Sequence, residues 1–265
     1  MKQLLTILLC TLFLSCQRRS STMREPIIAV DTIQKPTVVE DLLFSNDTIS
    51  LYKIDSISFY DAKSKIVLKT DTIPYIEDFE KVKAMLKGRA VFGNVSFSQG
   101  VMQVDTLIDG DNLCLIRALN GHTVSVLENT EFGYIGFYRY YPTEEILLFE
   151  GGHSSDFAID LRTGAVGAEL VGNPAYILYT PNKQFRLNGY FPGQECSGYF
   201  IQRMDGDYYM HVAEIPLHLT SEGFDLCTLK DSFWRDDTEL YFKNTYFGTD
   251  DDKRLGFFKL KIHSK

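Results

Sequence analysis

Short apolar runs alternate with short polar turns along most of the chain, and in the C-terminal half one such unit occurs three times. Each copy opens with a polar turn that leads into an apolar run: these are Tyr141–Phe149, Tyr179–Leu187 and Trp234–Phe242. A second apolar run follows in each copy, at Phe157–Leu161, Tyr199–Arg203 and Gly256–Leu260. Apolar runs of about four to eight residues bounded by turn residues are typical of β-strands. The pattern predicts three repeated β-units within residues 132–262.

The spacing of the copies indicates an architecture. Pro142 and Pro181 are 39 positions apart, and Arg235 follows 54 positions later, with the surplus in an insertion at residues 216–231. One blade of a β-propeller has ~40–50 residues, and the units resemble such blades. The sequence therefore predicts an all-β fold (mainly β with one short helix) with β-propeller-like blades in its C-terminal half. An incomplete propeller and a β-sandwich remain alternatives.

The preceding part of the chain carries further strand patterns and the helix. Short strands are predicted at 49–54, 57–60 and 66–68, and further strands at 90–97, 101–108, 112–119 and 122–128. Between these groups Ile76, Phe79, Val82 and Leu86 follow helical spacing, so the helix is predicted to begin at Pro74 and to end at Gly88. The β-rich domain is accordingly predicted to span residues 48–265.

The N-terminus reads as an export signal. One lysine precedes the apolar run Leu4–Leu14, which is too short for a spanning helix and has the layout of a signal peptide over residues 1–15. The run ends at Leu14-Ser15-Cys16, which resembles a bacterial lipobox, although Phe13 replaces its usual aliphatic residue. We expect acylation of Cys16, which would anchor the chain without a transmembrane helix. Residues 16–47 read as a flexible tether.

The net charge limits the class of binding partner, and the cysteine content limits the number of disulfides. A formal charge of −8 disfavours a nucleic-acid partner, because phosphate binding requires a basic surface. Beyond the signal and the lipidation site three cysteines remain, so at most one intramolecular disulfide forms, with Cys196–Cys227 as the candidate pair and Cys114 as a buried apolar residue. No nucleotide, dinucleotide or metal motif is present, and no cofactor is predicted.

Candidate contact residues lie mainly in loops, which on such scaffolds usually carry binding contacts. The loops are 151–156, 192–197 and 249–253, and the residues singled out in them are His153, Asp156, Glu195, Asp250 and Asp251. His153 and Asp156 flank two serines, but a catalytic triad is recognised by geometry and not by adjacency, so we interpret this loop without chemistry. The acidic turn at 249–252 has oxygen ligands suited to calcium but not the EF-hand spacing, and a solvated turn is the simpler interpretation.

The aromatic strand Phe132–Tyr141 is the most unusual in the chain. Strict alternation would place Tyr138 and Tyr140 on one face together with Tyr134. Burial in the core is the favoured interpretation, and a stacking platform for sugars is the alternative. Trp234 has the same two interpretations.

An acylatable cysteine, a tether and repeated β-units together resemble the uncharacterised lipoproteins of Bacteroidetes-type bacteria. The resemblance implies an exported protein anchored by lipid in the outer membrane or cell envelope. We expect a binding module without catalytic activity, whose partners are the membrane, through Cys16, and another envelope protein or a glycan. The alternative is a glycan-binding surface lipoprotein or a weak glycoside hydrolase, which would need two carboxyl groups at a defined separation.

Overall fold

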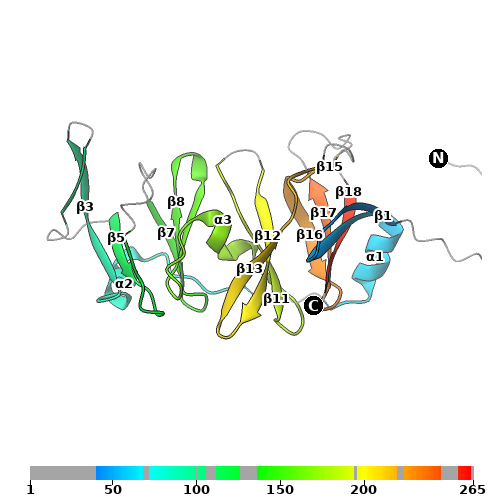
Figure 1. Cartoon of the computed structure of the whole chain (residues 1–265), viewed down its shortest axis with the longest axis horizontal. Coiled ribbons are helices and arrows are strands. Elements are labelled where there is room, and N and C mark those ends of the chain that lie inside the picture. The colour runs from blue at the N-terminus through cyan, green and yellow to red at the C-terminus, as the bar shows by residue number, and fades with distance from the viewer. Residues whose placement is uncertain are drawn as a thin grey trace, which may run out of the picture. The chain divides into compact units, whose positions relative to one another are not determined.

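The computed structural model describes residues 40–67, 72–98, 101–105, 112–125, 136–193, 196–219, 224–245 and 256–263 (Figure 1). These residues belong to one contact unit, Val38–Lys265. Most of the elements are antiparallel strands in small sheets, and within the described ranges no sheet closes on itself. The predicted all-β class is therefore confirmed.

Each repeated unit forms one antiparallel sheet. The first is β7-β8-β9, with β7 Gly136–Tyr141, β8 Ile146–Glu150 and β9 Asp156–Asp160. The second is β10-β11-β12-β13, with β10 Leu178–Tyr179, β11 Phe185–Tyr190, β12 Gly198–Asp205 and β13 Tyr208–Glu214. The third contains β16 Thr228–Trp234, β17 Glu239–Thr245 and β18 Gly256–Ile262. In every unit the predicted polar turn joins two neighbouring antiparallel strands.

The third unit is completed by the beginning of the domain. β1 Glu40–Ser45 and β2 Ile49–Ile54 extend its sheet, whose order is β1-β2-β18-β17-β16. In Figure 1 the two blue strands accordingly lie beside the red and orange ones. Strand β1 falls in the range 16–47 assigned from the sequence to the tether, so the folded part includes Glu40–Ser45.

Two further sheets complete the described strands. One has the order β4-β3-β5-β6, with β3 Ala90–Ser98, β4 Val101–Asp105, β5 Asn112–Arg117 and β6 Thr123–Ser125. The other pairs β14 His218–Leu219 with β15 Phe224–Asp225, inside the stretch interpreted as an insertion. The short helical elements are α1 Ser56–Ser64, α2 Phe79–Met85, α3 Ala168–Val171, η2 Gly152–Ser154 and η3 Pro174–Tyr176.

Shared apolar cores join the sheet of β3 to β6 to the first unit, and the second unit to the third. Strand β8 is buried on both faces: Leu147 and Phe149 pack with residues of α2, β3 and β5, whereas Ile146 and Leu148 pack with Val171 of α3. The largest core combines the sheets of the second and third units. Full burial of such side chains contributes about 1.5–3 kcal/mol each, and a strand covered on both faces reads as a continuous apolar run.

The segment 57–60, predicted as a strand, is part of helix α1. Asp55 caps this helix, since its carboxylate accepts the backbone N–H of Ser58 at 2.6 Å. Phe59 and Ala62 are buried while Ile57 and Tyr60 are exposed, which is helical and not alternating spacing. Phe59 packs edge-on against Phe233, 5.3 Å between ring centroids. Tertiary packing therefore overrides the β-propensity of the local aromatic run.

We expect Asp55→Ala to lower the free energy of unfolding by about 1 kcal/mol, because the cap satisfies a backbone donor at the end of the helix. Urea unfolding followed by circular dichroism measures this. Asp41→Ala, at an exposed position of β1, is the matched control and should change stability by less than about 0.5 kcal/mol. Equal losses in both variants would contradict the assignment of the cap.

Helix α2 begins at Phe79 and not at Pro74. The backbone of Ile76 both donates to and accepts from Tyr140, at 2.8 and 2.9 Å, so Ile76 pairs with the edge of β7. A residue paired in this way cannot contribute to a helix, and the carboxylate of Asp78 caps the helix two residues later. With three α-helices described, the prediction of a single one was wrong.

Strand β7 contains a bulge that strict alternation did not anticipate. Phe137 lies opposite Phe149 and Arg139 opposite Leu148, so Tyr138 is the extra residue without an opposite partner. As a result Tyr140 is 3% exposed and Tyr138 is 38% exposed, although alternation placed them on one face. A bulge shifts the register by one residue and reverses the facing of the residues before it.

Candidate functional site

The polar turns of the three units lie at the same end of their sheets, which we call the turn end. Neighbouring turns contact each other there: the Tyr179 hydroxyl donates to Glu144 Oε1 at 2.6 Å, and the Asn182 N–H donates to Asp237 Oδ1 at 2.8 Å. Side chains within the turns set their shape. Asn182 accepts the N–H of Gln184, as Asx turns do. The turn end thus brings together residues from all three copies.

A buried ion pair joins the first and second units at the turn end. Arg186 of β11 donates to Glu144 of the first turn and to Gln202 Oε1, the latter at 2.6 Å. The two charged side chains are only 4% and 9% exposed. Since both carboxylate oxygens of Glu144 accept hydrogen bonds, one from Arg186 and one from Tyr179, the charge is compensated inside the protein.

The polar network continues into the second sheet. Asn188 donates to Gln202 Oε1 at 3.2 Å and to the carbonyl of Val171 at 3.0 Å. Gly172 lies against Asn188 with φ +80°, and a Cβ atom there would approach Asn188 Nδ2 to 2.3 Å, so only glycine fits. Tyr209 stacks on the guanidinium of Arg186, 4.0 Å from ring centroid to carbon. Burial and the nearby Glu144 raise the pKa of Tyr179 far above its usual range, so its hydroxyl stays protonated and keeps donating.

A solvent-open hollow of about 630 Å³ adjoins this network. Its size falls in the range of ~300–1,000 Å³ typical of ligand sites. The lining residues are Thr72, Ile73, Pro74, Thr143, Glu144, Arg162, Tyr179, Lys183, Met204 and Tyr209. Tyrosines, hydroxyls and cationic groups from two neighbouring units therefore converge there, which makes the hollow the candidate functional site.

The opposite end of the sheets, the loop end, is held together by specific bonds. Asp156 accepts from the Phe191 N–H at 2.7 Å and from Asn173 Nδ2 at 2.9 Å, and the Asp156 N–H donates to the Phe191 carbonyl at 2.7 Å. Burial raises the pKa of Asp156. The hydrogen bonds from the two donors lower this pKa and the negative charge of nearby Glu150 raises it, each by less than burial does. The start of the predicted loop 192–197 thus lies beside the loop 151–156, because a Cβ added at Gly193 would also meet Ser155 at 2.9 Å.

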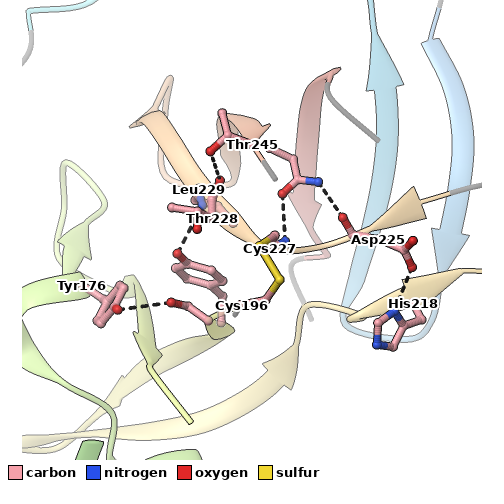
Figure 2. The surroundings of a disulfide bond; sticks show 11 residues. Tyr176, Cys196, His218, Asp225, Cys227, Thr228, Leu229 and Thr245 are labelled. Atoms are coloured by element: carbon pink, nitrogen blue, oxygen red, sulfur yellow. Dashed lines mark hydrogen bonds and ion pairs between the residues drawn. A yellow bond between two sulfur atoms is a disulfide. The ribbon is translucent and has the colours of Figure 1, made fainter. Parts of the chain in front are cut away.

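The disulfide Cys196–Cys227 joins the loop end of the second unit to the start of the third (Figure 2). Hydrogen bonds surround it: Tyr176 and Ser197 share one through their hydroxyls at 3.2 Å, and Asn244 accepts the Cys227 N–H at 2.9 Å. The predicted pairing is confirmed. Cys114 is buried in β5 as predicted, and burial raises the pKa of its thiol. A smaller hollow of about 170 Å³ lies beside Cys196, with the hydrogen-bonded pair His218–Asp225 on its wall.

The residues singled out from the sequence are not brought together into one site. Tyr140 and Trp234 lie in the core: the Tyr140 hydroxyl donates to Glu145, and the indole of Trp234 to the Leu178 carbonyl at 2.8 Å. Both are therefore packing residues and not exposed contacts. The exposed ring of Tyr138 lies 4.4 Å from the guanidinium of Arg139.

The structure describes only some of the remaining predicted residues. Asp156 is half-buried and satisfied as described. The backbone of His153 lies in η2, and its side chain lies outside the described groups. Glu195, Asp250 and Asp251 lie outside the described residues.

Sequence reasoning missed the residues around the hollow. Arg186 carried a usable signal, since a charge in the apolar run Phe185–Leu187 points to a buried partner. Arg162 and Lys183 carried none, because only the packing of two units makes them neighbours.

Comparison with known proteins gives no relative: no family model, no curated protein and no solved structure matches the chain. Within the described ranges no helix is long and apolar enough to cross a membrane. Nor do three or more potential metal ligands cluster in that part of the chain.

Proposed function

We propose that the chain is a lipid-anchored protein of the bacterial cell envelope that acts as a binding module. The N-terminal sequence supports the anchor, through the apolar run that ends at Cys16. The observation that carries the binding function is the hollow at the turn end, where Arg162, Tyr179 and Lys183 from two neighbouring units surround one open space. The ligand is another envelope macromolecule, a protein or a glycan.

We further propose that the sheets are blades of an incomplete β-propeller. Two features support this interpretation. Neighbouring sheets share cores on either side of the junction between the first and second units, and the N-terminal strands β1 and β2 complete the sheet of the last unit. A crystal structure in which the second unit does not pack face to face on its neighbours would rule it out.

The hollow gives less support to the glycoside hydrolase alternative. Glu144 is the carboxylate in its lining, and both of its oxygens are already hydrogen-bonded. An acid–base pair of carboxylates at the hollow is what hydrolysis would require.

We expect Cys16→Ala to release the protein from the membrane fraction, because a chain without acyl groups loses the anchor. The measurement is fractionation of producing cells, together with incorporation of a labelled fatty acid into the wild-type chain and the variant. Cys114→Ala is the matched control and should leave both unchanged. A Cys16→Ala variant that remains in the membrane fraction and still takes up label would contradict the proposal.

The binding function has its own test in cells. A photoreactive amino acid replaces exposed Lys183 at the hollow or, as the matched control, exposed Lys230 on β16. Irradiation of producing cells should yield an adduct with an envelope component from position 183 only. Equal or absent adducts at the two positions would count against a ligand at the turn end.

A further inference from the structure

The hollow carries more positive than negative charge although the chain as a whole carries −8. Two of its lining residues, Arg162 and Lys183, have no carboxylate partner in the described part of the chain. The carboxylate in the lining, that of Glu144, is neutralised by Arg186. Two uncompensated cations facing one open space attract an anionic ligand.

The backbones of both cationic residues are fixed, and the guanidinium of Arg162 is held as well. Arg162 donates from Nη2 to the Thr143 carbonyl at 2.6 Å, and its backbone N–H donates to Asp160 Oδ1 at 2.7 Å. A guanidinium has five N–H donors in a rigid plane, so the remaining donors stay available in a fixed orientation. Arg162 is therefore pre-oriented at the first unit's side of the hollow.

Lys183 is held at the other side. Its backbone adopts φ +59° in the second polar turn, and its carbonyl accepts the Tyr209 hydroxyl at 2.6 Å. The ammonium group lies 5.6 Å from the centroid of the Tyr179 ring. The fixed guanidinium of Arg162 and the fixed backbone of Lys183 lower the entropic cost of binding a ligand between them.

The other lining groups favour a sugar over an extended peptide. Tyr179 and Tyr209 lie with ring centroids 5.7 Å apart, and tyrosine combines an apolar ring with a polar hydroxyl. Thr72 and Thr143 add hydroxyl groups that can donate and accept, as a polyhydroxylated ligand needs. The hollow is compact, whereas recognition of an extended peptide commonly uses a free strand edge or a groove.

We propose that the hollow at the turn end binds an anionic saccharide, whose charged group lies between Arg162 and Lys183 and whose ring lies against Tyr179 and Tyr209. This inference rests on the proposed binding function and names its ligand class. A carboxylate is the group that the planar donor array of Arg162 fits best, by two parallel hydrogen bonds. A sulfated sugar presents the same charge to the same pair.

The test is calorimetric titration of the full acylated chain in detergent micelles. The probes are a trigalacturonate, a sulfated trisaccharide, neutral maltotriose as the uncharged match and tetraglutamate as an acidic peptide. We expect binding of at least one acidic trisaccharide about ten-fold or more tighter than maltotriose, and a loss of affinity between about 0.05 and 0.5 M salt as the charges are screened. The preferred acid identifies the charged group.

Variants locate the site. Lys183→Gln and Arg162→Gln should each weaken binding about ten-fold or more, because each removes a charged hydrogen-bond donor. Arg162→Lys keeps the charge but loses the planar donor array, so its affinity should fall between those of the wild type and Arg162→Gln. Lys230→Gln is the matched control and should bind as the wild type does. Thermal unfolding of every variant verifies the fold before titration.

Three results would overturn the inference: equal affinity for maltotriose, tighter binding of tetraglutamate than of any acidic trisaccharide, or binding that neither Lys183→Gln nor Arg162→Gln weakens. These failures are distinguishable from failure of the proposed function. If photo-crosslinking at position 183 still captures an envelope component while no acidic sugar binds, the binding function stands and only the ligand class is wrong.

Discussion

Replacing Arg186 by alanine is expected to lower the free energy of unfolding by about 3–5 kcal/mol. The substitution leaves the Glu144 carboxylate buried with Tyr179 as its remaining donor, and an uncompensated buried charge is far more costly than the loss of an exposed pair. Gln202 loses a charged donor at the same time. Urea unfolding, with stability extrapolated from the linear region, measures the change.

The matched control is Arg203→Ala. Arg203 lies on the neighbouring strand β12, opposite Phe185, but is exposed, so its loss should change stability by less than about 0.5 kcal/mol. The double variant Glu144→Leu/Arg186→Met should recover part of the loss, because it removes both buried charges together. If Arg186→Ala were no more damaging than Arg203→Ala, the buried pair would not contribute to stability as described.

Removing the Cys196–Cys227 disulfide is expected to cost about 4 kcal/mol. The cysteines are 31 residues apart, and closing a loop of that length restricts the unfolded chain by about this amount. The loop contains β12, β13 and the small sheet of β14 and β15. The variant Cys196→Ala/Cys227→Ala should therefore unfold at a lower urea concentration than the oxidised wild type.

Unfolding in the presence of a reductant is the control for the effect of the disulfide itself. The wild type and Cys114→Ala should both lose stability when reduced, whereas the double variant should not respond. Mass spectrometry of alkylated thiols verifies the redox state in each sample. An unchanged unfolding midpoint in fully reduced wild type would contradict a stabilising role of this disulfide.

These stability predictions distinguish residues that stabilise the fold from residues that would bind the ligand. Glu144 lines the hollow and is paired with Arg186, so the two charges satisfy each other and the loss of either should disturb the fold. Arg162 and Lys183 are therefore the residues through which ligand binding is tested, since Lys183 is exposed and neither is paired with a described carboxylate.

The local pattern alone determined the strands of the repeated units. The apolar runs of β8, β11 and β17 and the polar turns before them are read directly from residue order, because a hairpin depends on neighbours within about ten positions. The pairing Cys196–Cys227 was also accessible, since only three cysteines remained to consider. The anchor at Cys16 remains a prediction from the sequence.

Only the tertiary structure decided the rest. Segment 57–60 is helical because Phe59 packs on Phe233, far along the chain, and α2 starts late because Ile76 pairs with Tyr140. The bulge at Tyr138 depends on the register with β8. The hollow combines Arg162 of one unit with Lys183 of the next, and no local period encodes which faces of two sheets meet. Contacts between distant residues arise from packing of whole sheets, which the order of residues within one strand does not specify.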